Sequence, residues 1–331
     1  MTADHPVFRP ADPSLPDPVE QPEPVELPEP ATVHSRTAAL ALLVILALVW
    51  GVHWVVVKIG LDYMPPFTYA ALRVGSGLLT MVALLGVQGR LRRPDRSSLP
   101  IIVSVGIAQV AAGVVLMNLA LQAVPAGRSS VLVYTMPLWV AVLLAVLFGI
   151  RPRRNELIGL VLGIGGIILL LNPTVIDWSV PGELWGSLAL IVNAVLWAAV
   201  TVHIRRHRWT LGPLDLQPWQ LLTALVPIAI VAVLLEQGRE VRWEPATVLV
   251  LLFSGPLATA FATWASQSIT RSLGAQASAT GFLAIPVVGL ASGFVVLGEA
   301  LGPLDLLGFV LVLAGVGAAS LVPRAPRPAP G

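Results

Sequence analysis

The chain has 331 residues, of which 56% are hydrophobic and only 11% are charged, with a formal net charge of +2. An ordinary soluble domain carries about 25% charged residues, so these charges are too few to cover a water-soluble surface. The mean hydropathy of +0.83 indicates a protein that faces lipid, and the small net charge gives no support for nucleic-acid binding. The absence of cysteine excludes disulfides, thiolate metal sites and cysteine nucleophiles.

Residues 1–36 form a segment rich in proline and acidic residues, with the run PVEQPEPVELPEP. Its apolar surface is too small to offset the entropy cost of ordering, so we expect a disordered cytoplasmic tail. A signal peptide would need a basic start followed by an apolar stretch, which this acidic segment does not provide. We therefore expect membrane insertion to begin with the first hydrophobic helix.

Ten apolar stretches follow, each long enough to cross the roughly 30 Å hydrocarbon layer as a helix. They span 37–57, 66–88, 99–121, 126–149, 155–172, 183–204, 217–236, 246–269, 275–297 and 303–322. A transmembrane barrel would instead show short segments of alternating hydropathy. The predicted fold is therefore an all-α membrane protein of ten transmembrane helices, with a short C-terminal tail at 323–331.

The distribution of Lys and Arg between the loops predicts the orientation. With the N-terminus inside, the cytoplasmic segments carry Arg36, Arg90, Arg92, Arg93, Arg96, Arg151, Arg153, Arg154, Arg205, Arg206, Arg208, Arg271, Arg324 and Arg327. The opposite side carries only Lys58, Arg128, Arg239 and Arg242. Because positive residues favour the cytoplasmic side, we expect a multi-pass protein of the cell inner (plasma) membrane with both termini in the cytoplasm.

The sequence contains an internal repeat. A shift of 149 positions pairs Pro137 with Pro286 and Gly149 with Gly298, and a shift of 147 pairs Trp50 with Trp197. The halves, 37–172 and 183–322, then hold five helices each. Since five is odd, the second copy must enter the membrane inverted, an architecture typical of secondary transporters with a site near the midplane.

Three segments carry a resemblance to a known family. They are WGVHWVVVKIGLDYMPPFTYAALR, AGRSSVLVYTMPLWVAVLLAVLFG, and AQASATGFLAIPVVGLASGFVVLGE with its LGFVLVLAG continuation. They resemble the EamA family of the drug/metabolite transporter superfamily, and the likeness covers about 37–322. It implies two inverted five-helix repeats and export of small metabolites, amino acids or drugs. The Glu that commonly ends the fourth helix of each repeat is present as Glu299 but is Ile150 in the first, which argues against a symmetric role.

Ionisable and aromatic side chains within the spans are the first candidates for a site. Arg73 lies about seven residues into the second span, where a charge is costly unless it faces the bundle interior. Lys58 either extends to the outer interface or lines the outer mouth of the cavity. His53 either relays protons or is a structural histidine. Trp50, Trp54, Trp139, Trp197 and Trp264 either wall a substrate cavity or pack against helices and lipid.

Polar and proline residues add further candidates. Asn118, Tyr134, Asn193, Thr201 and Gln267 offer hydrogen-bonding groups that either line a cavity or join helices, and Asn118 matches Gln267 at the 149 shift. Pro137 and Pro286 are predicted within matching spans as hinges or static kinks. The predicted substrate cavity comprises Trp50, His53, Trp54, Lys58, Arg73, Asn118, Tyr134, Trp197, Trp264 and Gln267.

These features predict a secondary transporter that exports small metabolites such as amino acids by alternating access of the two repeats. A multidrug efflux carrier is the alternative, followed by a channel or an intramembrane enzyme. No HExxH, GxSxG or Walker A motif is present, so we expect no catalytic residue, cofactor or metal. Arg73 and Lys58, with no Asp or Glu in mid-span, favour carboxylate-bearing solutes over quaternary cations. The expected partners are a small-molecule substrate and the lipid bilayer, with no nucleic acid and no indication of oligomeric state.

Overall fold

The computed structural model describes residues 36–172, 174, 176–207 and 211–320. The predicted tails at 1–36 and 323–331 fall outside this part of the chain, apart from the backbone of Arg36. The described residues form helices joined by short loops, with no β-strand among them. The helices are α1 (Arg36–Leu61), α2 (Pro66–Val87), the 3-10 helix η1 (Arg96–Ser98), α3 (Leu99–Val103), the π-helix η2 (Ser104–Ala112), α4 (Gly113–Leu121), α5 (Ala126–Val133), α6 (Met136–Phe148), α7 (Arg154–Leu170), α8 (Glu183–Arg206), α9 (Pro213–Leu235), α10 (Pro245–Leu252), the π-helix η3 (Phe253–Phe261), α11 (Ala262–Phe282), α12 (Ala284–Leu297) and α13 (Pro303–Ser320).

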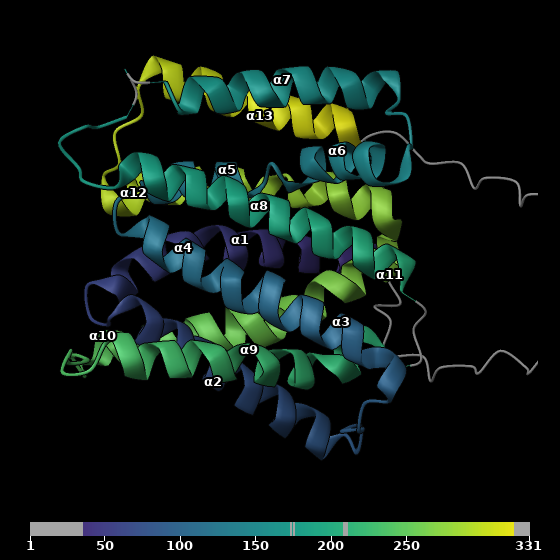
Figure 1. Ribbon diagram of the computed structural model, residues 1–331, viewed down its shortest axis with the longest axis vertical. Helices are drawn as coiled ribbons and strands as arrows, with labels where there is room; N and C mark the ends of the chain where they lie inside the picture. The colour runs from purple at the N-terminus through teal and green to yellow at the C-terminus, as the bar shows by residue number, and fades with distance from the viewer. Residues whose placement is uncertain (1–35, 173, 175, 208–210, 321–331) are drawn as a thin grey trace, which may run out of the picture. The chain divides into compact units, whose positions relative to one another are not determined.

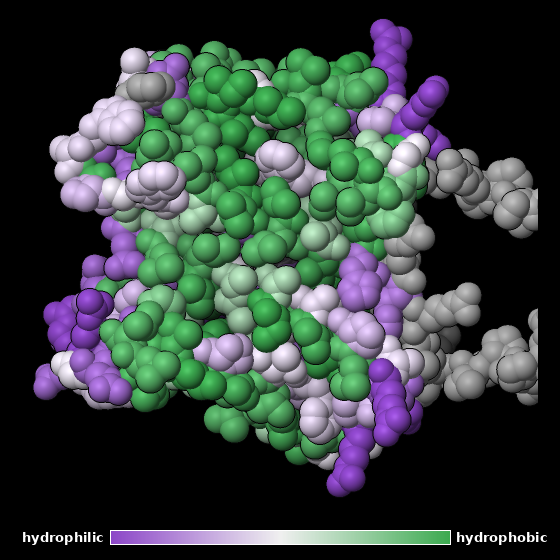
Figure 2. Space-filling view, viewed as in Figure 1, coloured by the Kyte–Doolittle hydropathy of each residue, from purple (hydrophilic) through white to green (hydrophobic). Residues whose placement is uncertain are grey.

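Eight helical segments of the described chain are long and apolar enough to cross a membrane. Two further predicted spans are shorter as helices, because α7 has 17 residues and α12 has 14. Figure 2 shows a broad apolar band with polar residues gathered on two sides of it, as expected for a protein surrounded by lipid. The all-helical, multi-pass membrane class is therefore confirmed.

One predicted boundary is wrong. A break between two spans is predicted between residues 269 and 275, whereas α11 runs without interruption from Ala262 to Phe282. In the matching loop of the first half, Pro125 precedes α5 with extended backbone, and its missing N–H prevents a helix from continuing through it. The position 149 residues further on is Gly274, which keeps its N–H, so the helix continues to a break at Leu283.

The two halves depart from regular helix at matching positions. The π-helices η2 and η3 have nine residues each, and their first residues, Ser104 and Phe253, are 149 positions apart. The break between α5 and α6 matches the break between α11 and α12. Gly149 and Gly298 end α6 and α12 with φ of 63° and 65°, a left-handed conformation that glycine adopts without strain. The shift that aligns the two sequences therefore also aligns their helical irregularities.

Pro137 and Pro286 lie beside these breaks. Both are predicted within continuous spans, but each lies in the first turn of the helix that follows a break, α6 or α12. A first-turn residue has no intrahelical partner for its N–H, so proline costs no hydrogen bond there. The two prolines are therefore compatible with helix starts rather than with kinks inside a helix.

The helices pack closely where glycine removes the side chain. Figure 1 shows α7 and α13 side by side at one edge of the bundle, and each packs mainly against the other. A Cβ atom added at Gly159 would lie 2.5 Å from the carbonyl oxygen of Gly315, and one at Gly166 would lie 2.7 Å from that of Gly308. Nearer the centre, α1 packs against α5, α11, α12 and η3, so it contacts elements of both halves.

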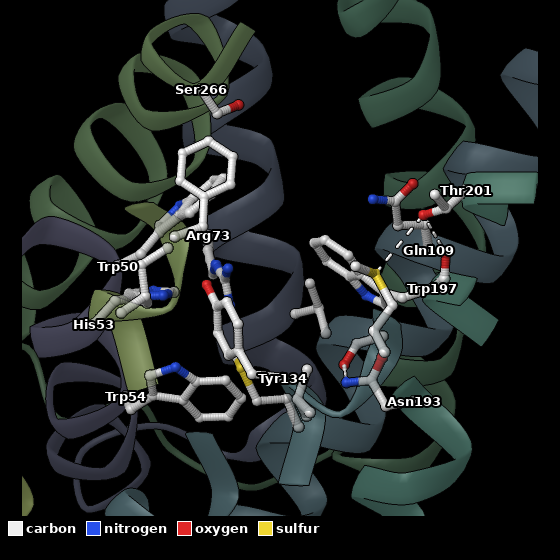
Figure 3. A pocket seen from close by; sticks show the side chains of 17 residues that line it. Trp50, His53, Trp54, Arg73, Gln109, Tyr134, Asn193, Trp197, Thr201 and Ser266 are labelled. Carbon is white, nitrogen blue, oxygen red and sulfur yellow. Dashed lines mark hydrogen bonds between the residues drawn. The ribbon is translucent and has the colours of Figure 1, made fainter. Parts of the chain in front are cut away.

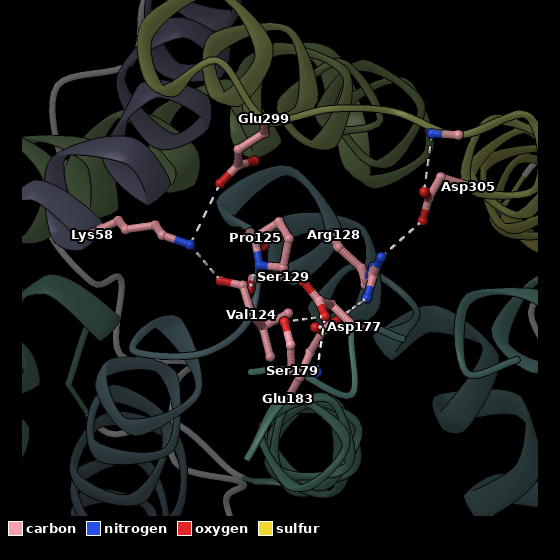
Figure 4. Close-up of polar contacts among 11 residues, drawn as sticks. Lys58, Val124, Pro125, Arg128, Ser129, Asp177, Ser179, Glu183, Glu299 and Asp305 are labelled. Atoms are coloured by element: carbon pink, nitrogen blue, oxygen red, sulfur yellow. Dashed lines mark hydrogen bonds and ion pairs between the residues drawn. The ribbon is translucent and has the colours of Figure 1, made fainter. Parts of the chain in front are cut away.

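A group of buried charges joins three helix starts (Figure 4). Arg128, near the start of α5, pairs with Glu183 at the start of α8 and with Asp305 at the start of α13, the latter at 3.1 Å. The three side chains are 7%, 4% and 11% exposed. Asp305 also accepts from the backbone N–H of Gly302, at 3.1 Å. We call Arg128, Glu183 and Asp305 the buried ion triad.

Candidate functional site

A cavity of about 300 Å³ lies where α1, α2, η2, α4, α8 and α11 meet the two helix breaks. Figure 3 shows its labelled side chains converging from both halves of the chain. On α1, Trp50, His53 and Trp54 are spaced at i, i+3 and i+4, which places them on one helix face. Six of the ten residues predicted for a substrate cavity line it, namely Trp50, His53, Trp54, Arg73, Tyr134 and Trp197.

Lys58 lies away from this cavity. Its Nζ donates to the carbonyl oxygen of Val124 at 2.9 Å and is 3.6 Å from Oε1 of Glu299. Glu299 in turn accepts the backbone N–H groups of Ala126 and Gly127, at 2.5 Å and 2.9 Å, and so caps the start of α5. Lys58 thus takes part in a polar contact between α1, the start of α5 and Glu299, two residues beyond the end of α12 (Figure 4).

Asn118 and Trp264 also lie elsewhere. Asn118 is fully buried and its Nδ2 donates to the carbonyl oxygen of Pro66 at 2.9 Å, joining α4 to the start of α2. Trp264 packs against Phe261, with ring centroids 5.7 Å apart. The side chain of Gln267 lies outside the described residues, so its predicted role stays a prediction. Position along a span indicates depth in the membrane but not the direction in which a side chain points.

Arg73 is the charged group of the cavity. Its Nε is 3.5 Å from Oγ1 of Thr259, and its Nη1 is buried with no hydrogen-bond partner among the described residues. No carboxylate of the described chain lies within ion-pair distance of this guanidinium. The described lining residues also include neither Asp nor Glu. The cavity therefore holds a cation whose counter-ion the described protein does not supply.

His53 and Trp50 form the wall beside Arg73. The His53 ring stacks on Phe253 with centroids 6.2 Å apart, and its Nε2 has no hydrogen-bond partner among the described residues. Trp50 donates from Nε1 to the carbonyl oxygen of Ala258 in η3, at 2.9 Å, so this indole is held in place by the π-helix. Figure 3 shows Trp50, His53 and Trp54 on the same side of the cavity as Arg73 and Tyr134.

Several lining residues escaped the sequence prediction of the cavity. They are Gln109, Gly113, Val114, Met117, Val133, Met136, Asn193, Thr201, Ser266, Phe282 and Ile285. Asn193 and Thr201 were singled out as hydrogen-bonding groups but not assigned to the cavity. Most of the others are apolar residues inside apolar spans, which hydropathy cannot distinguish from packing or lipid-facing positions.

The lining residues follow the internal repeat. Trp50 and Trp197, and likewise Trp54 and Thr201, are 147 positions apart, whereas three further pairs are 149 positions apart. The latter pairs are Met117 with Ser266, Val133 with Phe282, and Met136 with Ile285. Applied to Trp54, the repeat would have pointed to Thr201, whereas neither member of the three pairs 149 positions apart was predicted for the cavity. Neither of the residues that lie 147 or 149 positions after Arg73 lines the cavity, so the charge of Arg73 comes from one half only.

The helices and the cavity define a multi-pass membrane protein with a cavity lined by residues of both halves. The chain belongs to the EamA-like transporter family, whose model matches residues 37–172 and again residues 184–321. The resemblance to EamA transporters of the drug/metabolite superfamily is thereby confirmed. Because the family and the named relatives are transporters, the protein is a membrane transporter rather than an enzyme.

Curated relatives match over most of their length. "Uncharacterized transporter YoaV" of Bacillus subtilis is 24% identical over 271 residues, covering 81% of this chain and 92% of that protein. "Probable amino-acid metabolite efflux pump" of Salmonella typhimurium is 29% identical over 288 residues, covering 84% and 92%. The protein of the same name in Escherichia coli is 27% identical over 289 residues, covering 85% and 93%. A solved crystal structure matches with a TM-score of 0.58 at 23% identity, covering 87% of this chain and 98% of the other, which supports the fold alone.

Proposed function

We propose that the protein is a secondary transporter that exports small metabolites such as amino acids. It would work by alternating access between two inverted repeats of five helices, with ten crossings in all. Two relatives bear the name probable amino-acid metabolite efflux pump, which supports both the substrate class and the direction. The sequence carries no nucleotide-binding motif, which supports a secondary rather than an ATP-driven mechanism.

The observation that carries the proposal is Arg73 in the cavity without a carboxylate partner among the described residues. A buried cation without a counter-ion is costly, and a solute carboxylate would supply both the charge and the hydrogen-bond acceptors. A guanidinium binds a carboxylate through two parallel hydrogen bonds, so the solute would also be oriented. The substrate is therefore a small carboxylic acid, with amino acids as the leading class.

The size of the cavity favours small metabolites over drugs. Pockets for drug-sized ligands span about 300–1,000 Å³, and this cavity of about 300 Å³ is at the lower limit. Multidrug carriers for lipophilic cations would need an embedded carboxylate, and the described lining offers none. Multidrug efflux is therefore the second candidate, and a channel the third.

Alternating access requires points at which helices can bend. The α5–α6 and α11–α12 breaks, which adjoin the cavity and are followed by Pro137 and Pro286, are our candidates for the hinges. The arginine distribution in the loops supports a plasma-membrane protein with both termini in the cytoplasm. Accessibility tags in the loop at Arg151 and beside Arg205, at the end of α8, should then both react from the cytoplasmic side, and reaction from opposite sides would exclude this topology.

The experiment that tests the proposal is counterflow in proteoliposomes. Vesicles loaded with unlabelled amino acids should accumulate the labelled amino acid with saturable kinetics, whereas a channel would show high, unsaturated flux. Arg73→Ala should lower the rate at least about tenfold, since it removes a charge-assisted bond worth about 1.5–3 kcal/mol. Arg151→Ala removes an exposed loop arginine outside the cavity and serves as the matched control. Equal rates in wild type and Arg73→Ala would overturn the proposal.

A further inference from the structure

The cavity has a second polar wall, which lies across from Arg73. Gln109 of η2 and Asn193 and Thr201 of α8 form it, and Figure 3 shows them on the opposite side of the cavity from Arg73 and Tyr134. All three side chains are uncharged. We call these three residues the amide wall.

Asn193 contributes an unused hydrogen-bond acceptor. The residue is 3% exposed, and its Nδ2 donates to the carbonyl oxygen of Gly113 at 3.1 Å. Its Oδ1 is buried with no partner among the described residues. The amide can lie this close to α4 because position 113 is glycine; a Cβ atom there would lie only 3.1 Å from Oδ1 of Asn193. A buried acceptor left unpaired is unfavourable, so a donor on the solute would stabilise this side of the cavity.

Gln109 adds both a donor and an acceptor. No hydrogen bond within the described chain engages its side-chain amide, so its oxygen and its NH₂ group are available to a solute. The hydroxyl of Thr201 already donates to the carbonyl oxygen of Trp197 at 2.7 Å, which leaves its oxygen as an acceptor. The amide wall thus offers hydrogen bonds in both directions.

The absence of charge on this wall limits what can bind there. An ammonium or a second carboxylate would lose its hydration without meeting a counter-ion on the amide wall. An apolar group would leave the amide groups unpaired, which is the situation in which a site strongly rejects a ligand. A neutral group that both donates and accepts hydrogen bonds, such as a carboxamide, neither buries an unpaired charge nor leaves the amide groups without partners.

We propose that the amide wall sets the substrate specificity. The transported acid binds its carboxylate at Arg73 and carries a neutral hydrogen-bonding group at its other end, which Gln109 and Asn193 bind. This inference rests on the proposed function, since it takes the cavity as the transport site.

The test compares counterflow of four amino acids by the full-length protein in proteoliposomes. Glutamine ends in a carboxamide, norleucine in a hydrocarbon, lysine in an ammonium and glutamate in a carboxylate. Wild type should prefer glutamine over each of the others by about tenfold or more. Gln109→Leu should bring the ratio of glutamine to norleucine close to one, while Gln122→Leu, an exposed glutamine outside the cavity, should leave it unchanged.

Asn193→Asp should produce a gain of lysine transport, which a misfolded protein could not show. Asp is close to Asn in size, although it loses the Nδ2 donor to Gly113, and its carboxylate would give an ammonium a counter-ion on the amide wall, so lysine uptake should rise at least about tenfold relative to glutamine. Unchanged ratios in both Gln109→Leu and Asn193→Asp would overturn the assignment of the amide wall. If Arg73→Ala still abolishes uptake in that case, the proposed function stands and only this inference fails. If Arg73→Ala has no effect, both fail.

Discussion

The buried charged residues of this membrane protein differ in whether they have an oppositely charged partner. In the buried ion triad, one guanidinium faces two carboxylates, and all three side chains are at most 11% exposed. Desolvated ions are costly unless paired, so each member depends on the others. Arg73 is the contrasting case, since its charge has no carboxylate partner in the described chain, and we propose that the solute supplies one.

Arg128→Met should destabilise the protein strongly. It leaves Glu183 and Asp305 buried without their shared cation, at a cost of about 3–5 kcal/mol. The measurement is thermal unfolding of the purified protein in detergent, followed by tryptophan fluorescence. Arg151→Met is the control, because Arg151 is an exposed loop residue that takes part in none of the ion pairs of the described chain, so its loss should cost less than about 1 kcal/mol. Equal losses in the two variants would contradict this difference.

At the residue scale, the sequence predicted the charged and aromatic part of the cavity. Arg73, His53 and Trp54 were recognisable because polar and bulky side chains are unusual in apolar spans. Gln109 and Phe282 were missed, since an amide or an aromatic residue inside a span is equally compatible with helix packing. Lys58 was expected either at the outer interface or at the outer mouth of the cavity; it lies one helical turn after Trp54 on α1 and donates to the carbonyl oxygen of Val124.

Among the helices, the pair of α7 and α13 depends on contacts that only glycine permits. A Cβ atom at Gly159 would lie 2.5 Å from the carbonyl oxygen of Gly315, and one at Gly315 would lie 2.6 Å from that of Gly159. Lipid provides little hydrophobic drive for helix association, so close packing of this kind is the main source of stability between spans.

Gly159→Ala should therefore push α7 and α13 apart and lower the stability by about 1–3 kcal/mol. Gly165→Ala lies in the same helix, but no heavy atom lies within 4 Å of the added Cβ, so no loss is expected. Thermal unfolding in detergent compares the two variants. If Gly159→Ala matched wild type, the close contact between the two helices would be refuted.

The positions of the helices were largely predictable because a span requires about 20 apolar residues. The π-helices and the breaks at Tyr134 and Leu283 were not, since they change the hydrogen bonding of a helix without changing its hydropathy. The boundary expected between 269 and 275 failed for a related reason: Gly274 replaces the Pro125 that interrupts the first half.

For the whole molecule, we propose that the cavity opens alternately to the two sides of the membrane. The cavity is lined by repeat-related residues of both family-matched segments, as a rocking mechanism would require. The chain has no cysteine, so a single introduced thiol can report on one position without background.

Ser266→Cys places such a thiol in the cavity by a conservative change, since Ser266 lines the cavity and its hydroxyl only donates to the carbonyl oxygen of Thr263, at 3.0 Å. A membrane-impermeant maleimide is applied to right-side-out and to inside-out vesicles, with Thr174→Cys, in an exposed loop, as the one-sided control. We expect the thiol of Ser266→Cys to react from both sides, and glutamine to slow both reactions. Reaction from one side only, or no protection by any transported amino acid, would contradict alternating access through this cavity.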